Sequence, residues 1–89
     1  MAKLKREDIL EELRRICEQV GYTLRFERGD FVGGACILHK ERVLVVNTRS
    51  SIERKIAVIV RALAEIGVEG VYLKPAIREL IEAELGHKP

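Results

Sequence analysis

Three stretches of the chain carry apolar residues at the spacing of an α-helix. In residues 5–21 (KREDILEELRRICEQVG) the apolar side chains share one face and charged side chains fill the other. The apolar positions are Ile9, Leu13, Ile16, Cys17 and Val20. Gly21 follows the last of them and can end the helix in a left-handed conformation.

The second helical stretch, residues 50–67, also carries a run of apolar residues, IAVIV, that taken alone is typical of a strand. Ser50 with Glu53 fits a capping box and Gly67 fits a C-terminal cap, so the pattern predicts a helix between them. Its broad apolar face predicts the central, most buried helix. That face comprises Ile52, Ile56, Ile59, Val60, Leu63 and Ile66.

The third stretch follows a short extended piece predicted at residues 71–73. Pro75 suits the first turn of a helix, where its missing N–H costs nothing, and Gly86 suits the end. The predicted buried stripe is Ile77, Leu80, Ile81 and Leu85. Residues 87–89 are expected to be a frayed tail.

Between the first two helices the pattern changes to alternation, which is typical of strands. Residues 22–28 form the first strand, and Gly29 with Asp30 supply a turn. Residues 35–38 (ACIL) and 43–47 (VLVVN) form the second and third, joined by a tight turn at residues 39–42.

If Lys40 and Glu41 centre that turn, Leu38 faces Val43 and Cys36 faces Val45, which makes the second and third strands antiparallel. The chain is thus predicted to be one α+β domain, residues 1–89. Its element order is α-β-β-β-α-(β)-α. The sheet is expected to be a three-stranded antiparallel meander with helices packed on it.

The strand at residues 43–47 is apolar on both faces, unlike the alternating first strand. Each side of the sheet near it should therefore be covered by something other than water. Helices can cover one side, and the other needs a remaining helix or a second copy of the chain. This pattern predicts a homodimer.

Charge is balanced, with 16 Lys and Arg against 14 Asp and Glu, and the signs are interleaved. Nucleic-acid binding usually needs clustered basic charge with aromatic platforms, and only Lys3, Lys5 and Arg6 form even a short basic stretch. The amide side chains are limited to Gln19 and Asn47, a composition typical of thermophilic proteins.

The chain has no run of 18 apolar residues and no secretory signal at its start, so we expect a cytoplasmic protein without a membrane segment. Cys17 and Cys36 are then expected to be reduced, and their spacing matches no zinc motif. We expect no metal and no cofactor.

Cys36 is the one catalytic candidate. A reactive thiol needs solvent access and a neighbouring base or helix N-terminus, whereas Cys36 lies inside an apolar strand. His39 is three positions away, an odd number, so the two side chains should point to opposite faces. The pattern favours a buried, structural Cys36, with His39 in solvent at a hairpin tip.

Gly33, Gly34, Asn47, Arg49 and Ser50 are the ligand-binding candidates. The glycine pair permits a sharp bend or a close backbone approach, and the bend is favoured because a strand follows instead of a helix. The junction after the third strand offers donors to an anion near a helix N-terminus. Helix capping is the commoner use of such residues.

The order of hairpin, VLVVN strand and apolar helix in residues 31–67 resembles the core of zinc peptidases of the ImmA/IrrE type. In that family the helix carries HExxH, whereas here it reads VRALAEI, without His. The resemblance therefore implies a relative without peptidase activity. The whole chain, particularly GGAC and YLKPAIREL, also resembles small bacterial proteins of no assigned function.

These observations favour a small non-catalytic interaction or scaffold protein that forms a homodimer. The alternatives are a thiol-dependent enzyme or redox-active protein using Cys36, and a weak nucleic-acid binder using Lys3, Lys5 and Arg6 together with the Arg-rich side of the hairpin. The sequence leaves the identity of a small-molecule ligand unknown.

Overall fold

The computed structural model describes residues 4–29 and 34–86, which contain three helices and one three-stranded sheet. In chain order the elements are α1 (Arg6–Gln19), β1 (Thr23–Glu27), β2 (Ala35–Leu38), β3 (Val43–Asn47), α2 (Ile52–Ile66) and α3 (Pro75–Gly86). The predicted α+β class is confirmed, and each helical pattern corresponds to one helix.

The predicted antiparallel meander is wrong, because β3 lies between the other two strands in the order β1-β3-β2. β1 runs parallel to β3, with Leu24 beside Leu44, while β2 runs antiparallel to it. The physical reason is burial: the strand that is apolar on both faces takes the centre, and the alternating strand takes an edge.

The predicted pairing within the hairpin is confirmed, since Cys36 lies opposite Val45 and Leu38 opposite Val43. The turn closes with a hydrogen bond of 3.3 Å from the Arg42 N–H to the His39 carbonyl. Arg42 itself has a positive φ of 56°, a conformation that costs a non-glycine residue on the order of 1 kcal/mol.

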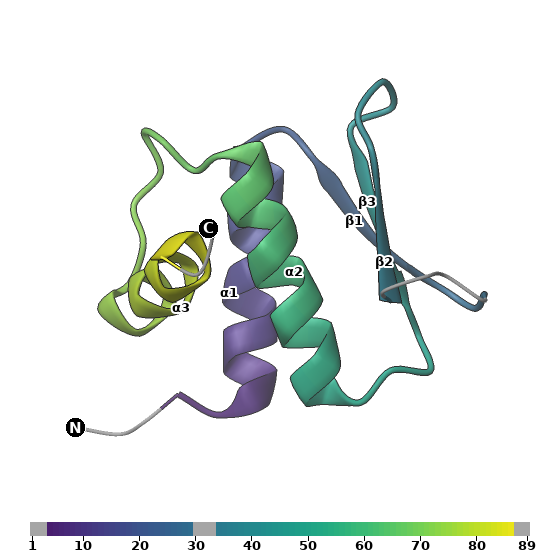
Figure 1. The fold of residues 1–89 in the computed structure, drawn as a ribbon, viewed down its shortest axis with the longest axis horizontal. Helices are drawn as coiled ribbons and strands as arrows, with labels where there is room; N and C mark the ends of the chain where they lie inside the picture. The colour runs from purple at the N-terminus through teal and green to yellow at the C-terminus, as the bar shows by residue number, and fades with distance from the viewer. Residues whose placement is uncertain (1–3, 30–33, 87–89) are drawn as a thin grey trace.

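All the helices that the structure describes lie on one side of the sheet, with α1 and α2 between the sheet and α3 (Figure 1). The core forms where the inner face of the sheet meets α1 and α2. Leu13, Leu44 and Leu63 are fully buried there, and burying each contributes about 1.5–3 kcal/mol. The predicted central helix is confirmed, because α2 contacts the sheet and both other helices.

The ends of α2 correct one detail of the sequence interpretation. Ser51, not Ser50, is the N-cap, and its hydroxyl accepts a hydrogen bond of 3.1 Å from the Arg54 N–H. Gly67 caps the other end, as predicted, with its N–H bonded to the Leu63 carbonyl.

In α3, Pro75 is the first residue and Gly86 the last, as predicted. Only half of the predicted stripe is buried, because Leu80 is 36% exposed and Leu85 47% exposed. The other half, Ile77 and Ile81, packs in the core. The predicted tail at residues 87–89 lies outside the described residues.

The extended strand predicted at residues 71–73 is absent from the described part of the chain. Leu73 is buried in the core instead, and the residues on either side of it contact side chains of α1. Arg15 donates to the Tyr72 carbonyl at 3.4 Å, and Lys74 pairs with Glu12 at 3.1 Å. The segment is therefore tied to a helix and not to a sheet edge.

Candidate functional site

The junction between β3 and α2 brings together three of the predicted ligand-binding residues, Gly34, Asn47 and Ser50. The Asn47 side chain is bonded at both ends of its amide: Nδ2 donates to the Gly29 carbonyl at 2.8 Å, and Oδ1 accepts from the Arg49 N–H at 3.0 Å. Its polar groups thus join the β1–β2 connection to the start of the β3–α2 loop. This role is structural.

Gly34 lies where its backbone passes close to the start of α2. Its φ is +86°, and a Cβ placed on it would lie 3.4 Å from Arg54 Nε and 3.6 Å from Ser50 Oγ. The contacts would be ordinary ones, so the positive φ, and not a lack of space, is what favours glycine here; this agrees with the predicted bend. Gly33 lies outside the described residues, and Arg49 is exposed.

The prediction that Cys36 is buried is wrong, because its side chain is exposed. Strand alternation explains the error. In β2, Ala35 and Ile37 face the helices, so Cys36 and Leu38 face outward. Both pairs of residues are apolar, so the sequence of β2 does not show which pair the helices cover; the register with β3 decides this.

Cys17 is buried in the core on α1, as its place in the apolar stripe predicts. Burial raises the pKa of its thiol to about 12, because the thiolate would lose its hydration. Of the two thiols, only Cys36 is open to a reagent in water.

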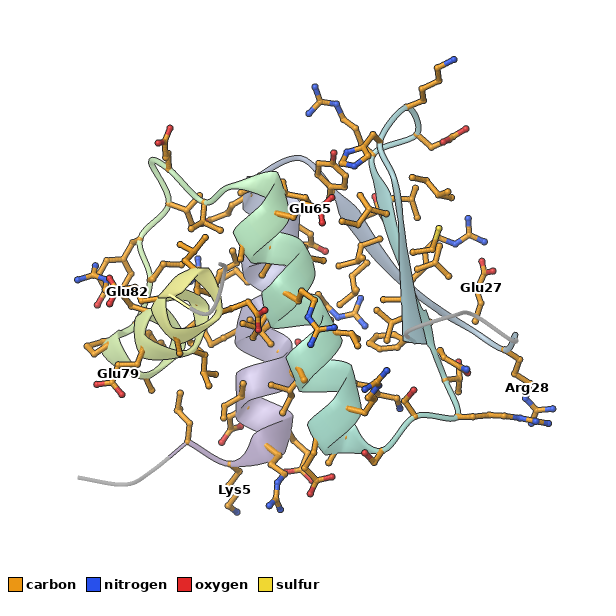
Figure 2. All side chains as sticks on the ribbon, viewed as in Figure 1. Lys5, Glu27, Arg28, Glu65, Glu79 and Glu82 are labelled. Atoms are coloured by element: carbon orange, nitrogen blue, oxygen red, sulfur yellow. The ribbon has the colours of Figure 1, made fainter. Side chains whose placement is uncertain are left out.

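His39 lies at the hairpin tip on the side opposite Cys36, as predicted, but it is not simply solvated. Its Nδ1 forms a hydrogen bond of 3.0 Å with the Tyr22 hydroxyl, and its Nε2 lies 4.0 Å from a Glu65 carboxylate oxygen. Figure 2 labels Glu65 near the C-terminal end of α2. Sequence reasoning missed this cluster, because the three residues are far apart in the chain.

The cluster of Tyr22, His39 and Glu65 joins the hairpin to the ends of α1 and α2. Tyr22 is 9% exposed, whereas the His39 and Glu65 side chains are each about 60% exposed, so the side chains of His39 and Glu65 are open to water. An exposed pair at 4.0 Å contributes little, on the order of 0–1 kcal/mol. The arrangement positions the hairpin and offers no enclosed site.

An open pocket of about 660 Å³ lies on the α3 side of α2, near the C-terminal ends of α1 and α2. Its floor includes Leu63 and Ile81, and the Arg42 side chain reaches its rim. Glu65 is two positions after Leu63, so at about 100° per residue it points to nearly the opposite side of the helix. The polar cluster therefore does not line the pocket.

The residues do not fit the zinc chemistry of the resembled peptidases. No group of three or more His, Cys, Asp or Glu side chains within residues 4–29 and 34–86 could hold a metal ion. α2, the helix that would correspond to the metal-binding one, contains no His. Of the predicted basic stretch, Arg6 pairs with Glu53 at 3.1 Å, and Lys3 lies outside the described residues.

The outer face of the sheet is the remaining candidate surface. None of the described helices lies against it (Figure 1). Its central row runs from Arg25 across Val45 to Cys36, and the next row contains Val43 and Leu38. Leu38 is 39% exposed, whereas Val45 is covered by the side chains around it.

In three comparisons with known proteins, no family model, no curated protein and no solved structure matched the chain. No helix in the described ranges is both long enough and apolar enough to span a bilayer.

Proposed function

We propose that this protein is a small non-catalytic interaction protein that acts as a homodimer and uses its sheet as the contact surface. The observation that carries the proposal is that, in the described part of the chain, helices cover one side of the sheet. β3 has apolar side chains on both faces, but the described helices cover only one of them. On that side Val45 is screened by neighbouring side chains, and the exposed apolar positions beside β3 are Cys36 and Leu38 of β2.

The described polar groups support a non-catalytic role. Asn47 is used to join loops, and the cluster around His39 is open to water. The resemblance to ImmA/IrrE-type peptidases supports the same role, because it implies a relative of these enzymes that has no peptidase activity.

Sedimentation equilibrium over a range of micromolar concentrations tests the proposal. We expect a reversible dimer that is weakened at least tenfold by Cys36→Lys combined with Leu38→Lys, because both changes put charge on the exposed side of β2. The matched control is Ala76→Lys with Ala83→Lys, two exposed positions on α3 that add the same charge. A well-folded wild-type monomer at all concentrations would contradict the proposal.

One observation favours a second candidate, the thiol-dependent enzyme or redox-active protein, because Cys36 is exposed. Exposure alone makes labelling fast, so the labelling rate no longer separates the candidates. The discriminating quantity is the thiol pKa of Cys36, measured from the pH dependence of alkylation in a Cys17→Ala background. A pKa well below the range of about 8.5 to 9 of an ordinary thiol would favour thiol chemistry, and a pKa within that range would count against it.

A further inference from the structure

The edge of β2 is the least protected edge of the sheet. Both β1 and β2 are edge strands, but β1 carries Arg25 and Glu27, whereas β2 (Ala35–Leu38) has no charged residue and no Pro. Proteins usually protect edge strands with charge, Pro or a bulge, since unpaired backbone groups attract another strand. No described element pairs with the free edge of β2.

The hydrogen bonds on the other side of the sheet show which backbone groups are free. The Thr23 N–H donates to the Arg42 carbonyl and the Thr48 N–H to the Glu27 carbonyl. Backbone groups alternate between the two sides of a strand. The even-numbered residues of β3 therefore point to β1, and its odd-numbered residues point to β2.

It follows that Val43 and Val45 share hydrogen bonds with their partners in β2, which are Leu38 and Cys36. The N–H and C=O groups of the alternate residues, Ala35 and Ile37, then point away from the sheet. These two residues are the free donors and acceptors of the edge.

We infer that the dimer of the proposed function forms by antiparallel pairing of the two β2 edges about a two-fold axis that passes between the two Cys36 residues. In this register Ala35 of each chain bonds Ile37 of the other. Both free residues of each strand are then paired. A register centred on Ile37 would place Ala35 opposite His39, whose carbonyl is already used by the turn.

The occupant is a second copy because β2 is complementary to itself. An uncharged strand meets its own copy without like-charge repulsion across the pair. Stacking of the outer faces is the alternative geometry. Edge pairing adds main-chain hydrogen bonds and joins the two outer faces into one surface.

The inference places two exposed thiols side by side. Cys36 and its copy would form a pair without mutual hydrogen bonds, in which Cα atoms are about 4.5 Å apart, a distance compatible with a disulfide. Diamide is a suitable probe. It accepts two electrons and two protons from two thiols, which form one S–S bond while the reagent becomes the hydrazine.

The test is carried out on the Cys17→Ala variant, so that only Cys36 can react. We expect native diamide treatment to give a disulfide dimer at least tenfold faster than in a control with Cys36→Ser and Thr23→Cys. That control carries one exposed thiol on the same face but on the opposite edge strand. Equal rates for the two variants would indicate random collision and would overturn the inferred register.

Two lysine variants separate this inference from the proposed function. Edge pairing predicts that Cys36→Lys dissociates the dimer and that Val43→Lys, on the same face but in the central strand, does not. If Val43→Lys dissociates the dimer and Cys36→Lys does not, with both proteins folded by circular dichroism, the edge register is refuted but the homodimer of the proposed function is not. A wild-type monomer would refute both, and Cys36→Ser should remain dimeric.

Discussion

The buried thiol of Cys17 leads to a specific prediction about stability at high pH. The side chain lies at 0% exposure in the core of α1, α2 and the sheet. Loss of hydration raises the pKa of its thiol from 9.0 to about 12, opposed by the positive charge of Arg14 and assisted by the negative charge of Glu18. The folded protein therefore keeps this proton at a pH where the unfolded chain releases it.

The sign and size follow from linkage. Below the ordinary pKa of 9.0 the thiol is neutral in both states, and its stabilising effect is fully present. As the pH rises from 9.0 toward the pKa of the folded state, the free energy of unfolding falls by about 1.4 kcal/mol per pH unit, because only the unfolded chain releases the proton. The total approaches ~4 kcal/mol, a large fraction of the 5–15 kcal/mol that stabilises a typical domain.

Urea unfolding of a Cys36→Ser protein with and without Cys17→Ala, both under reducing conditions, measures this effect. Near neutral pH we expect the Cys17→Ala change to cost on the order of 1 kcal/mol, because it leaves a small cavity. At a pH midway between the two thiol pKa values, the Ala variant should be the more stable one. Other groups titrate alike in both proteins and cancel from the difference.

Parallel stability curves for the two proteins across this pH range would refute the reasoning. They would mean that the Cys17 thiolate is as well solvated in the folded protein as in the unfolded chain. Alkylation of Cys17 at the same rate in native and urea-unfolded protein would lead to the same conclusion.

Three further predictions follow from hydrogen bonds of the described residues. Ser51→Ala should lower the free energy of unfolding by about 1 kcal/mol through loss of the N-cap, whereas Ser50→Ala should change it much less; equal losses in urea unfolding would contradict the assignment of the cap. Asn47→Asp loses the amide donor that bonds the Gly29 carbonyl, and should lower the free energy of unfolding, measured in urea, by about 1–3 kcal/mol. Thr48→Ala, the control, should leave it near the wild-type value. For Glu12, burial raises the pKa, but hydrogen bonds from its two cationic partners outweigh this and leave the pKa below 4.5. The stability from Glu12 is thus present above that value and is lost as the pH falls through the folded pKa, so Glu12→Gln should flatten the acid limb of a stability–pH curve.

Local patterns were sufficient to predict the helices and the hairpin. The capping glycine after α2 and the proline at the start of α3 act through the conformation of their own backbone, so their neighbours in sequence are enough to interpret them. The pairing of Cys36 with Val45 was also predictable, because a short turn fixes the register of the strands that it joins.

The position of β1 could not be predicted in this way. Whether β1 joins β2 or β3 depends on which strand is buried on both faces, and this is a property of the whole sheet and not of one turn. The apolar pattern of β3 was the available signal, since a strand of that composition is typical of the centre of a sheet.

By itself, the sequence determined the class of fold, the boundaries of most elements and the burial of Cys17, because periodicity and capping are local. The tertiary structure decided the order of the strands and the side of the sheet that the helices cover. It thereby decided which alternate residues of β2 face water. Cys36 and Ile37 are equally apolar neighbours, and only the packing of α1 and α2 against one face covers Ile37 and leaves the thiol of Cys36 exposed.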